Sequence, residues 1–306
     1  MGEPAREACG VVGVYTPGEN AARTAFFGLF SLQHRGQESA GIATSDGYNQ
    51  FLHTSMGLVS QAFHEFDLQR LPGHMAIGHT RYSTTGSSQE KNAQPLMVQG
   101  ISGPLALGHN GNVINALELR REAIDFWGCN FQTSTDSEVI AQILCNAPGA
   151  NWQDRISFAM RRLRGAYSLV VLLQNSLMAI RDPLGVRPLC VGTLNDGWVV
   201  ASESCALDNV GAQFIREIEP GEAIRIDDEG LHTIYQHPTE KRAICVFESI
   251  YFARTDSILD GNLVYKSRQY MGKELAQEHP VEADLVIGIP DSATAAAVGY
   301  SEESKI

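Results

Sequence analysis

The sequence lacks the two features that mark membrane proteins and disulfide-rich secreted proteins. No apolar run approaches the roughly 20 residues that a membrane-spanning helix needs. No two cysteines are spaced as CxxC, and their wide, irregular spacing in a 306-residue chain is not that of a disulfide framework. The six cysteines are Cys9, Cys129, Cys145, Cys190, Cys205 and Cys245. We therefore expect reduced cysteines and a cytoplasmic protein.

Basic residues are also scarce. The chain has 23 Lys and Arg against 35 Asp and Glu, which gives a net charge of −12. This balance argues against a nucleic-acid groove and against binding to an anionic membrane surface. It does not exclude a phosphorylated small molecule, because a local basic pocket can lie on an acidic protein. The hydrophobic content of 43% is ordinary for a globular chain with a sizeable core.

The first eight residues, MGEPAREA, lack the hydrophobic stretch of a secretory signal. Cys9 follows them directly and opens the apolar segment CGVVGVY. Two interpretations are open. Cys9 is a buried strand thiol, or it is the first residue of the working protein once the leader has been removed.

Alternating strand-like and helix-like segments fill the first 235 or so residues, and the chain shows no internal repeat or low-complexity tract. Period-2 patterns, β-branched residues and flanking turn residues predict strands, and apolar residues at i, i+4 and i+7 predict helices. Many strands joined by short turns indicate helices layered on largely antiparallel sheets. The expected strands are 9–15, 39–46, 75–83, 104–110, 167–174, 177–182, 198–204 and 222–228, and the expected helices are 20–34, 115–127, 137–145 and 154–164.

The character of the chain changes at 233–243, a polar segment with a proline that we take as a linker. A helix is expected at 263–278, followed by the apolar strand ADLVIGI (283–289) and a helix of small residues. This order is typical of the first unit of a parallel α/β domain. A single unit cannot cover both faces of such a sheet, so we expect a second domain that is cut short.

Asn110 and Gly111 follow an expected strand and allow two interpretations. Asn-Gly is the commonest hairpin-turn dipeptide. Alternatively, the Asn110 amide and the Gly111 N–H form an oxyanion hole, in which each donor contributes roughly 3–4 kcal/mol to a transition state.

Three other places combine a structural and a functional interpretation. Thr135 and Glu138 have capping-box spacing, and Asp136 between them is a candidate partner for a substrate ammonium. Arg81, near the end of a strand, is a candidate for gripping a carboxylate bidentately. Arg35 and Gly36 end a helix, and we assign that stretch a positioning role.

The motifs CGVVGVY, LQHRGQESAGI, GHTRYSTTGSS, HNGN and TSTDSE together resemble the N-terminal-nucleophile glutamine amidotransferases. RDPLGVRPL (181–189), ASES (201–204) and FESIYFARTDS (247–257) narrow the resemblance to the amidophosphoribosyltransferase family. The resemblance implies an α+β fold, a four-layer αββα sandwich followed by the start of an α/β phosphoribosyltransferase domain. It divides the chain into a propeptide (1–8), a class II glutaminase domain (9–237), and a linker with an incomplete phosphoribosyltransferase domain (238–306).

The resemblance also implies the chemistry. Cys9 attacks the glutamine amide with its own α-amine as the base, and ammonia passes to phosphoribosyl pyrophosphate in the purine pathway. This chain alone is expected to support only the glutaminase half. The alternatives are another N-terminal-nucleophile amidotransferase and an inactive truncated chain. The matching positions are Cys9, Asn110 and Gly111 for catalysis, and Arg81, Asp136, Arg35 and Gly36 for substrate binding.

Cofactors and partners are implied in the same way. Ser292 matches a position associated with Mg²⁺ bound together with phosphoribosyl pyrophosphate, and Cys245 matches a ligand of a 4Fe–4S cluster whose other ligands are missing. The family also implies purine nucleotides as feedback inhibitors and a homo-oligomer at full length. The chain departs from the usual family residues at Ser249, Thr255, Ala293 and Ala295.

Overall fold

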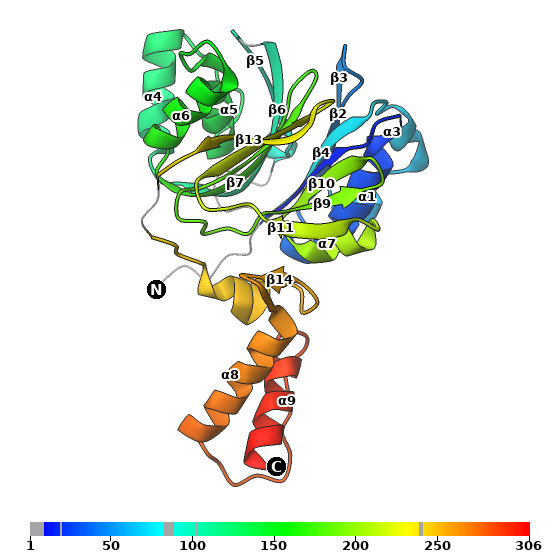
Figure 1. The fold of residues 1–306 in the computed structure, drawn as a ribbon, viewed down its shortest axis with the longest axis vertical. Helices are drawn as coiled ribbons and strands as arrows, with labels where there is room; N and C mark the ends of the chain where they lie inside the picture. Colours follow the sequence, from blue (N-terminus) through cyan, green and yellow to red (C-terminus); the bar gives the residue numbers. More distant parts are fainter. Residues whose placement is uncertain (1–8, 19, 83–88, 102, 239–240) are drawn as a thin grey trace.

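Two stacked antiparallel sheets form the centre of the molecule in this computed structural model (Figure 1), which describes residues 9–18, 20–82, 89–101, 103–238 and 241–306. The leader 1–8 and residues 83–88 of the GHTRYSTTGSS motif lie outside the described residues. The first sheet has the order β11-β9-β10-β1-β4-β2-β3, and the second has the order β13-β12-β8-β7-β6-β5.

The first sheet contains β1 (Gly10–Tyr15), β2 (Ser39–Ser45), β3 (Gln50–Met56), β4 (Met75–Arg81), β9 (Cys190–Leu194), β10 (Gly197–Ala201) and β11 (Gln213–Glu217). The second contains β5 (Leu96–Gly100), β6 (Gly103–Val113), β7 (Gly165–Leu172), β8 (Leu177–Arg181), β12 (Glu222–Asp227) and β13 (Gly230–Gln236).

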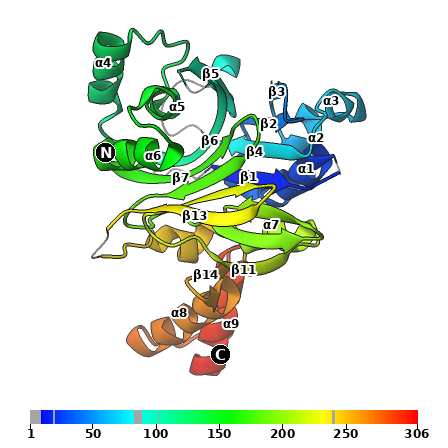
Figure 2. The same cartoon turned by 45° about the horizontal axis from the view of Figure 1, so that its top comes forward.

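Helices cover the outer face of each sheet, as Figure 2 shows. The first sheet packs against α1 (Ala21–Ser31), α2 (Val59–Ala62), α3 (Glu65–Gln69) and α7 (Ser204–Asn209), and the second against α4 (Ala116–Trp127), α5 (Asp136–Asn146) and α6 (Trp152–Arg162). A third apolar core lies between the sheets. The four-layer αββα sandwich is therefore confirmed.

The side chains of β1 alternate between two apolar cores. Val12 and Val14 enter the core beneath α1, while Val11 and Tyr15 enter the core between the sheets. Successive side chains of a strand point to opposite faces, so odd-numbered positions here face the second sheet. Cys9 precedes β1 by one residue and is 6% exposed.

The Asn110–Gly111 pair is not a turn. Both residues lie inside β6, where Asn110 pairs with Ser168 and Gly111 with Tyr167 of β7. The hairpin interpretation is therefore wrong, because the strand continues to Val113 with a partner along its whole length. The predicted strand 198–204 is likewise too long, since β10 ends at Ala201 and Ser204 begins α7.

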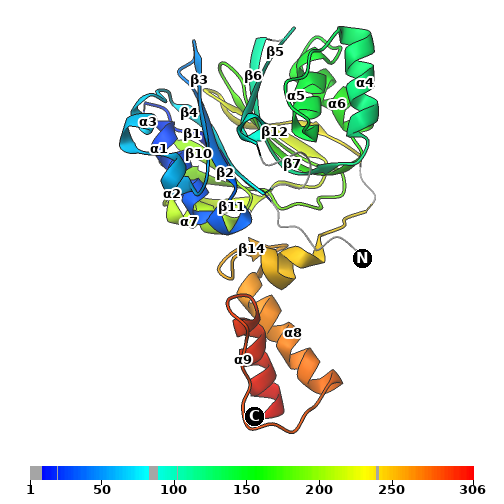
Figure 3. The same cartoon turned by 180° about the vertical axis from the view of Figure 1, so that it is seen from behind.

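The expected linker 233–243 begins too early, because β13 continues to Gln236 as the edge strand of the second sheet. Beyond it lie a helical turn, η3 (Glu248–Phe252), the small hairpin β14 (Ile258–Leu259) and β15 (Asn262–Leu263), α8 (Val264–Glu278) and α9 (Ala293–Ser304). The two long helices project from the sandwich side by side and run in the same direction (Figure 3).

The expected strand 283–289 does not form, because the structure describes these residues as irregular chain. Leu285, Ile287 and Ile289 are 70%, 78% and 79% exposed. A strand requires hydrogen-bonding neighbours, and no other strand of the described chain lies beside this segment.

Two glycines let α8 and α9 touch at the backbone. A Cβ on Gly272 would lie 1.9 Å from the Ala296 carbonyl oxygen, and one on Gly299 would lie 1.9 Å from that of Gln269. Arg268 anchors α8 to the preceding segment, since its Nε donates to Ser249 O at 2.8 Å and its Nη2 to Ala253 O at 2.7 Å.

Candidate active site

The Cys9 thiol lies at the end of the sheet stack, where β1, β4 and β6 come together. Its Sγ donates to Tyr82 O at 3.4 Å, and the Tyr82 N–H points back to Sγ at 3.5 Å. Burial raises the pKa of the Cys9 thiol, while the Tyr82 backbone and the charge of Arg81 lower it to a smaller extent. The thiol is therefore protonated near neutral pH and needs a base before it can act as a nucleophile.

A small cavity of about 10 Å³ opens beside this thiol. It is lined by Cys9, Arg81, Tyr82, Gln94, His109, Gly111, Thr135, Asp136 and Ser137. The fold thus brings four of the predicted site residues together from four separate stretches of sequence. The cavity has room for about one water molecule, so an amino-acid ligand enters only after side chains move aside.

Asn110 carries a fully buried side-chain amide. It is 0% exposed, and neither its Nδ2 nor its Oδ1 has a hydrogen-bond partner among the described residues. Ala106 on the same strand enters the core between the sheets, so the period of two places Asn110 on that inner face as well. A buried amide without partners destabilises the folded chain by roughly 1–3 kcal/mol. A ligand oxygen that accepts a hydrogen bond from it would restore this stability.

Gly111 occupies a position that only glycine tolerates. Its φ of +154° lies in the region that L side chains avoid, and a Cβ would stand 2.0 Å from Ala166 O. The same virtual Cβ would lie 2.8 Å from the His109 ring. Glycine is therefore required here by the backbone conformation and by the close neighbours. The Gly111 backbone lies directly along the cavity.

Asp136 is the first residue of α5. Thr135 caps the helix, with its Oγ1 accepting from Glu138 N at 3.3 Å, as the sequence predicted. The Glu138 carboxylate reaches further back than a capping box requires and accepts from the backbone of Gln132 and Thr133. Asp136 Oδ2 accepts from Val113 N at 2.9 Å, which ties α5 to the end of β6.

Arg81 ends β4 and is 2% exposed. Its guanidinium is ion-paired with Glu38, which is partly buried. The pair holds a buried cation at the wall of the cavity, where a ligand carboxylate would compete with or join Glu38.

His109 also lines the cavity, and the sequence reasoning missed it. Its Nδ1 lies 3.1 Å from Ser137 Oγ and 3.9 Å from Asp136 Oδ2. Burial lowers the pKa of His109, although Asp136 acts in the opposite direction. A neutral histidine beside Asp136 is therefore part of the site. Its sequence signal was its place directly before Asn110, because β6 continues through both residues.

Arg35 and Gly36 do not line the cavity. Arg35 lies behind it, with its Nε donating to Cys9 O at 3.0 Å. Gly36 has extended backbone and lies so close to β4 that a Cβ would approach Thr80 O to 2.7 Å. Arg35 therefore contacts the Cys9 backbone, and Gly36 packs against the end of β4.

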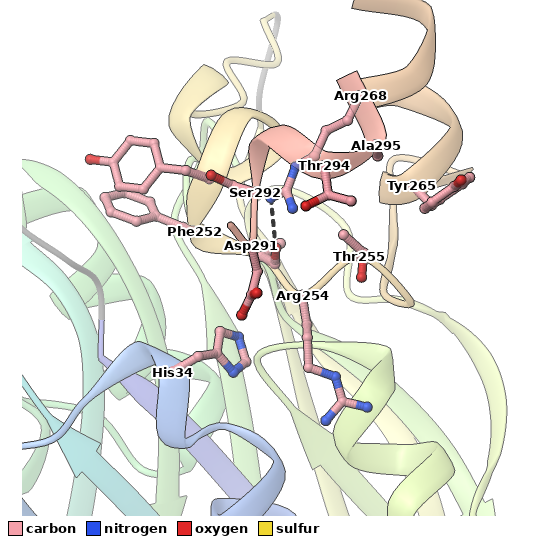
Figure 4. A pocket seen from close by; sticks show the side chains of 12 residues that line it. His34, Phe252, Arg254, Thr255, Tyr265, Arg268, Asp291, Ser292, Thr294 and Ala295 are labelled. Atoms are coloured by element: carbon pink, nitrogen blue, oxygen red, sulfur yellow. Dashed lines mark hydrogen bonds between the residues drawn. The ribbon is translucent and has the colours of Figure 1, made fainter. Parts of the chain in front are cut away.

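A larger pocket of about 570 Å³ lies between the sandwich and the helix pair (Figure 4). Its lining includes His34 from the turn after α1, Arg254, Arg268, Asp291 and Ser292. Asp291 and Ser292 offer a carboxylate and a hydroxyl, which are oxygen ligands of the type that Mg²⁺ accepts together with substrate phosphates. These two residues would supply two oxygen ligands to such an ion.

Cys245 lies elsewhere, with its Sγ 3.9 Å from Nη1 of Arg187. In the part of the chain that the structure describes, the one group of three possible metal ligands is Asp227, Glu229 and His232, and it does not contain Cys245. A 4Fe–4S cluster needs four cysteines, so the described residues do not fit one. Among the described helices, none has the length and apolar character required to cross a bilayer.

The comparisons with known proteins agree with this geometry. Residues 79–209 match the family model described as a glutamine amidotransferase domain. The chain is 49% identical over 302 residues to the amidophosphoribosyltransferase of Synechococcus elongatus, with 97% of this chain and 61% of that protein covered. It is 45% identical to the amidophosphoribosyltransferase of Methanocaldococcus jannaschii, with 97% of this chain and 67% of that protein covered.

A solved structure is similar over the same span. The glutamine phosphoribosylpyrophosphate amidotransferase from B. subtilis, complexed with ADP and GMP, superposes with a TM-score of 0.91 at 43% identity. The match covers 97% of this chain and 64% of that one. The chain therefore spans about three fifths of the length of such relatives.

Proposed function

Since this chain belongs to the amidophosphoribosyltransferase family, we propose that it hydrolyses glutamine to glutamate and ammonia at Cys9. The observation that supports the proposal is the cavity that joins the Cys9 thiol to Arg81, Gly111 and Asp136. Arg81 binds the α-carboxylate of glutamine and Asp136 binds its α-ammonium. The side-chain amide then extends toward the thiol.

The reaction begins after residues 1–8 have been removed. The α-amine of Cys9, with an ordinary pKa of about 7.7–8.0, accepts the thiol proton. This base is needed because burial raises the pKa of the thiol. While the leader is attached, the same nitrogen is an amide and cannot accept a proton.

The thiolate sulfur adds to the amide carbon, and the carbonyl electron pair moves onto oxygen. The Asn110 amide and the Gly111 N–H hold this oxyanion, each contributing roughly 3–4 kcal/mol. Collapse of the adduct breaks the C–N bond, the ammonium of Cys9 returns its proton to the leaving nitrogen, and ammonia departs. Water then hydrolyses the thioester and releases glutamate.

For the whole protein, we propose that ammonia displaces pyrophosphate from phosphoribosyl pyrophosphate and forms 5-phosphoribosylamine, an early step of purine biosynthesis. The pocket that contains Arg254 and Arg268 supports an anionic ligand at this end of the chain. Mg²⁺ would neutralise the pyrophosphate there, with Asp291 and Ser292 as protein ligands. Cys245 holds a 4Fe–4S cluster only if three further cysteines join it.

The proposal extends to the inhibitors, the cellular location and the assembly of the protein. Purine nucleotides are proposed as feedback inhibitors, since the B. subtilis relative is complexed with ADP and GMP. We propose a cytoplasmic protein that forms a homo-oligomer at full length and binds neither nucleic acid nor membrane.

The test combines intact mass with glutamate release from glutamine. We expect a processed species that begins at Cys9 and releases glutamate, and no release while residues 1–8 are attached. Cys9→Ser should lower the rate about a thousandfold or more. Cys129→Ser, which changes a cysteine outside the cavity, serves as the matched control and should keep the rate. Undiminished release by Cys9→Ser would disprove the proposal.

A further inference from the structure

Arg35 is a buried arginine whose nitrogens are almost fully occupied. It is 1% exposed, and Nε donates to the Cys9 carbonyl at 3.0 Å. Nη1 and Nη2 donate to Glu248 Oε2 and Oε1 at 3.0 and 2.8 Å, and Nη1 also donates to Glu203. These contacts use four of the five N–H groups of the guanidinium, so its orientation is fixed by two carboxylates and one backbone carbonyl.

Glu203 and Glu248 have no exposed surface, and each has further partners. Glu203 accepts from Ser257 Oγ at 2.6 Å and from Arg254 N at 2.9 Å, and it contacts His34. Glu248 also accepts from Arg187 at 3.0 Å. Burial alone would raise the pKa of Glu203, but Arg35 and His34 hold it well below its ordinary value. Both carboxylates are thus compensated, which a buried charge requires.

The cluster joins three parts of the chain that are far apart in sequence. Arg35 follows α1, Glu203 follows β10, and Glu248 lies in η3 beyond the glutaminase sandwich. A buried ion cluster of this kind contributes little to stability compared with apolar packing. Its geometric effect is specific, because the two carboxylates fix Arg35, and Arg35 donates to the carbonyl of the residue that carries the thiol.

A hydrogen bond to the Cys9 carbonyl can position both reacting groups, because the nucleophilic thiol and the α-amine base belong to the same residue. With Gly10 paired to Thr80, this hydrogen bond fixes the Cys9–Gly10 peptide plane and therefore the position of the Cys9 Cα. Tyr82 holds the Sγ, and a placed Cα together with a placed Sγ fixes where the terminal amine lies beside the thiol. A displacement of about 1 Å in such a site costs roughly a hundredfold in rate.

We propose that Glu203 and Glu248 are positioning residues for Cys9 and act on it through Arg35. The inference rests on the proposed glutaminase activity. It assigns a role in that activity to a residue outside the sandwich, because Glu248 reaches Arg35 from η3. Neither carboxylate lines the Cys9 cavity, so both act without touching glutamine.

The test compares Glu203→Gln and Glu248→Gln with the parent in processed, full-length chains. Each variant should lower kcat about tenfold or more and leave the KM for glutamine within about twofold, because Arg81 and Asp136 are unchanged. Glu248→Asp restores the charge and should recover part of kcat. Glu222→Gln is the matched control: Glu222 is 3% exposed and bound by both Nη atoms of Arg216, and it lies outside the Cys9 cavity.

A second readout follows the thiol directly. The rate of Cys9 alkylation by iodoacetamide is measured by intact mass across a pH series. In both Gln variants the midpoint should move to higher pH, because a displaced amine no longer accepts the thiol proton, and in Glu222→Gln it should not move. This comparison remains valid if the parent releases no glutamate, a result that would count against the proposed function alone.

A purely structural role gives a different pattern. The variants would then unfold more easily, while kcat and the alkylation midpoint stayed at the parent values, and the inference would be overturned. If Glu203→Gln does not fold by circular dichroism, Glu248→Gln and Glu248→Asp carry the test. A rise in KM with kcat unchanged would also overturn it.

Discussion

Two buried polar side chains lie between the two sheets, beside the apolar core that fills most of that space. His79 and Asn110 are both 0% exposed there, and each has an atom without a partner among the described residues. Such groups lower stability unless a ligand or a water satisfies them. Both lie beside residues that line the Cys9 cavity, since Asn110 stands between His109 and Gly111, and the His79 ring donates to His109 O.

The buried state of His79 predicts how stability depends on pH. Burial lowers the pKa of His79 from 6.5 to about 3, although its ring donates to His109 O. Below about pH 6.5 the unfolded chain therefore binds a proton that the folded chain does not. The free energy of unfolding should fall by up to about 1.4 kcal/mol per pH unit from this residue as the pH decreases.

Urea unfolding at a series of pH values checks this. His79→Gln should show a shallower loss of stability between about pH 6.5 and 4.5, within the window set by the two pKa values. His232→Gln removes an exposed histidine and should keep the parent slope. Equal slopes for all three chains would contradict the prediction.

Single residues of the site could be predicted where the residue type and a recognisable motif together indicate a chemical role. Cys9, Arg81, Gly111 and Asp136 were named from residue type and motif, and they share one cavity. His109 was missed because its one signal, the position directly before Asn110, becomes meaningful only when β6 is known to continue through both residues.

Helix α5 shows how an element places a functional group. Its start is fixed by the Thr135 cap, and its first residue is Asp136. The sequence predicted this start because capping is local and depends on residues only a few positions apart. The continuation of β6 through Asn110 and Gly111 was not predictable in that way, since it depends on β7, more than 50 residues further along the chain.

Removing the cap should affect both stability and binding. We expect Thr135→Ala to lower the free energy of unfolding by about 1 kcal/mol and to raise the KM for glutamine, because Asp136 is less well held. Urea unfolding and steady-state glutaminase kinetics measure the two effects. Asn151→Ala removes the corresponding cap of α6 and should lower stability by about the same amount with no change in KM. A similar KM increase in both variants would contradict a specific role for the α5 start.

The molecule as a whole has a well-packed sandwich and a sparsely packed end. Three apolar cores lie within the αββα layers, whereas the segment 279–292 leaves apolar side chains exposed. Apolar residues repeating every 2 positions in strands and about every 3.6 positions in helices predicted the layers, because each repeat indicates which face of the element is buried. The same apolar pattern at 283–289 predicted a strand that did not form, since apolar character alone provides no neighbouring strand.

The exposed segment predicts concentration-dependent association of the chain. Ile287 and Ile289 are 78% and 79% exposed and lie close together, and contiguous apolar surface favours contact with other molecules. Replacing both by Lys should reduce association in sedimentation velocity. Tyr48→Lys is the control, because Tyr48 is 84% exposed but lies far away in the chain, on the β2–β3 turn. A parent chain that sediments as a monomer at every concentration would refute the prediction.

The parallel course of α8 and α9 has an electrostatic consequence. Peptide dipoles in two helices that run the same way add along the pair and repel across it, and the packing at Gly272 and Gly299 opposes that repulsion. The positive ends of both dipoles point toward the 570 Å³ pocket. The pocket therefore attracts a multiply charged anion by its backbone as well as by its arginines, and added salt should weaken that attraction.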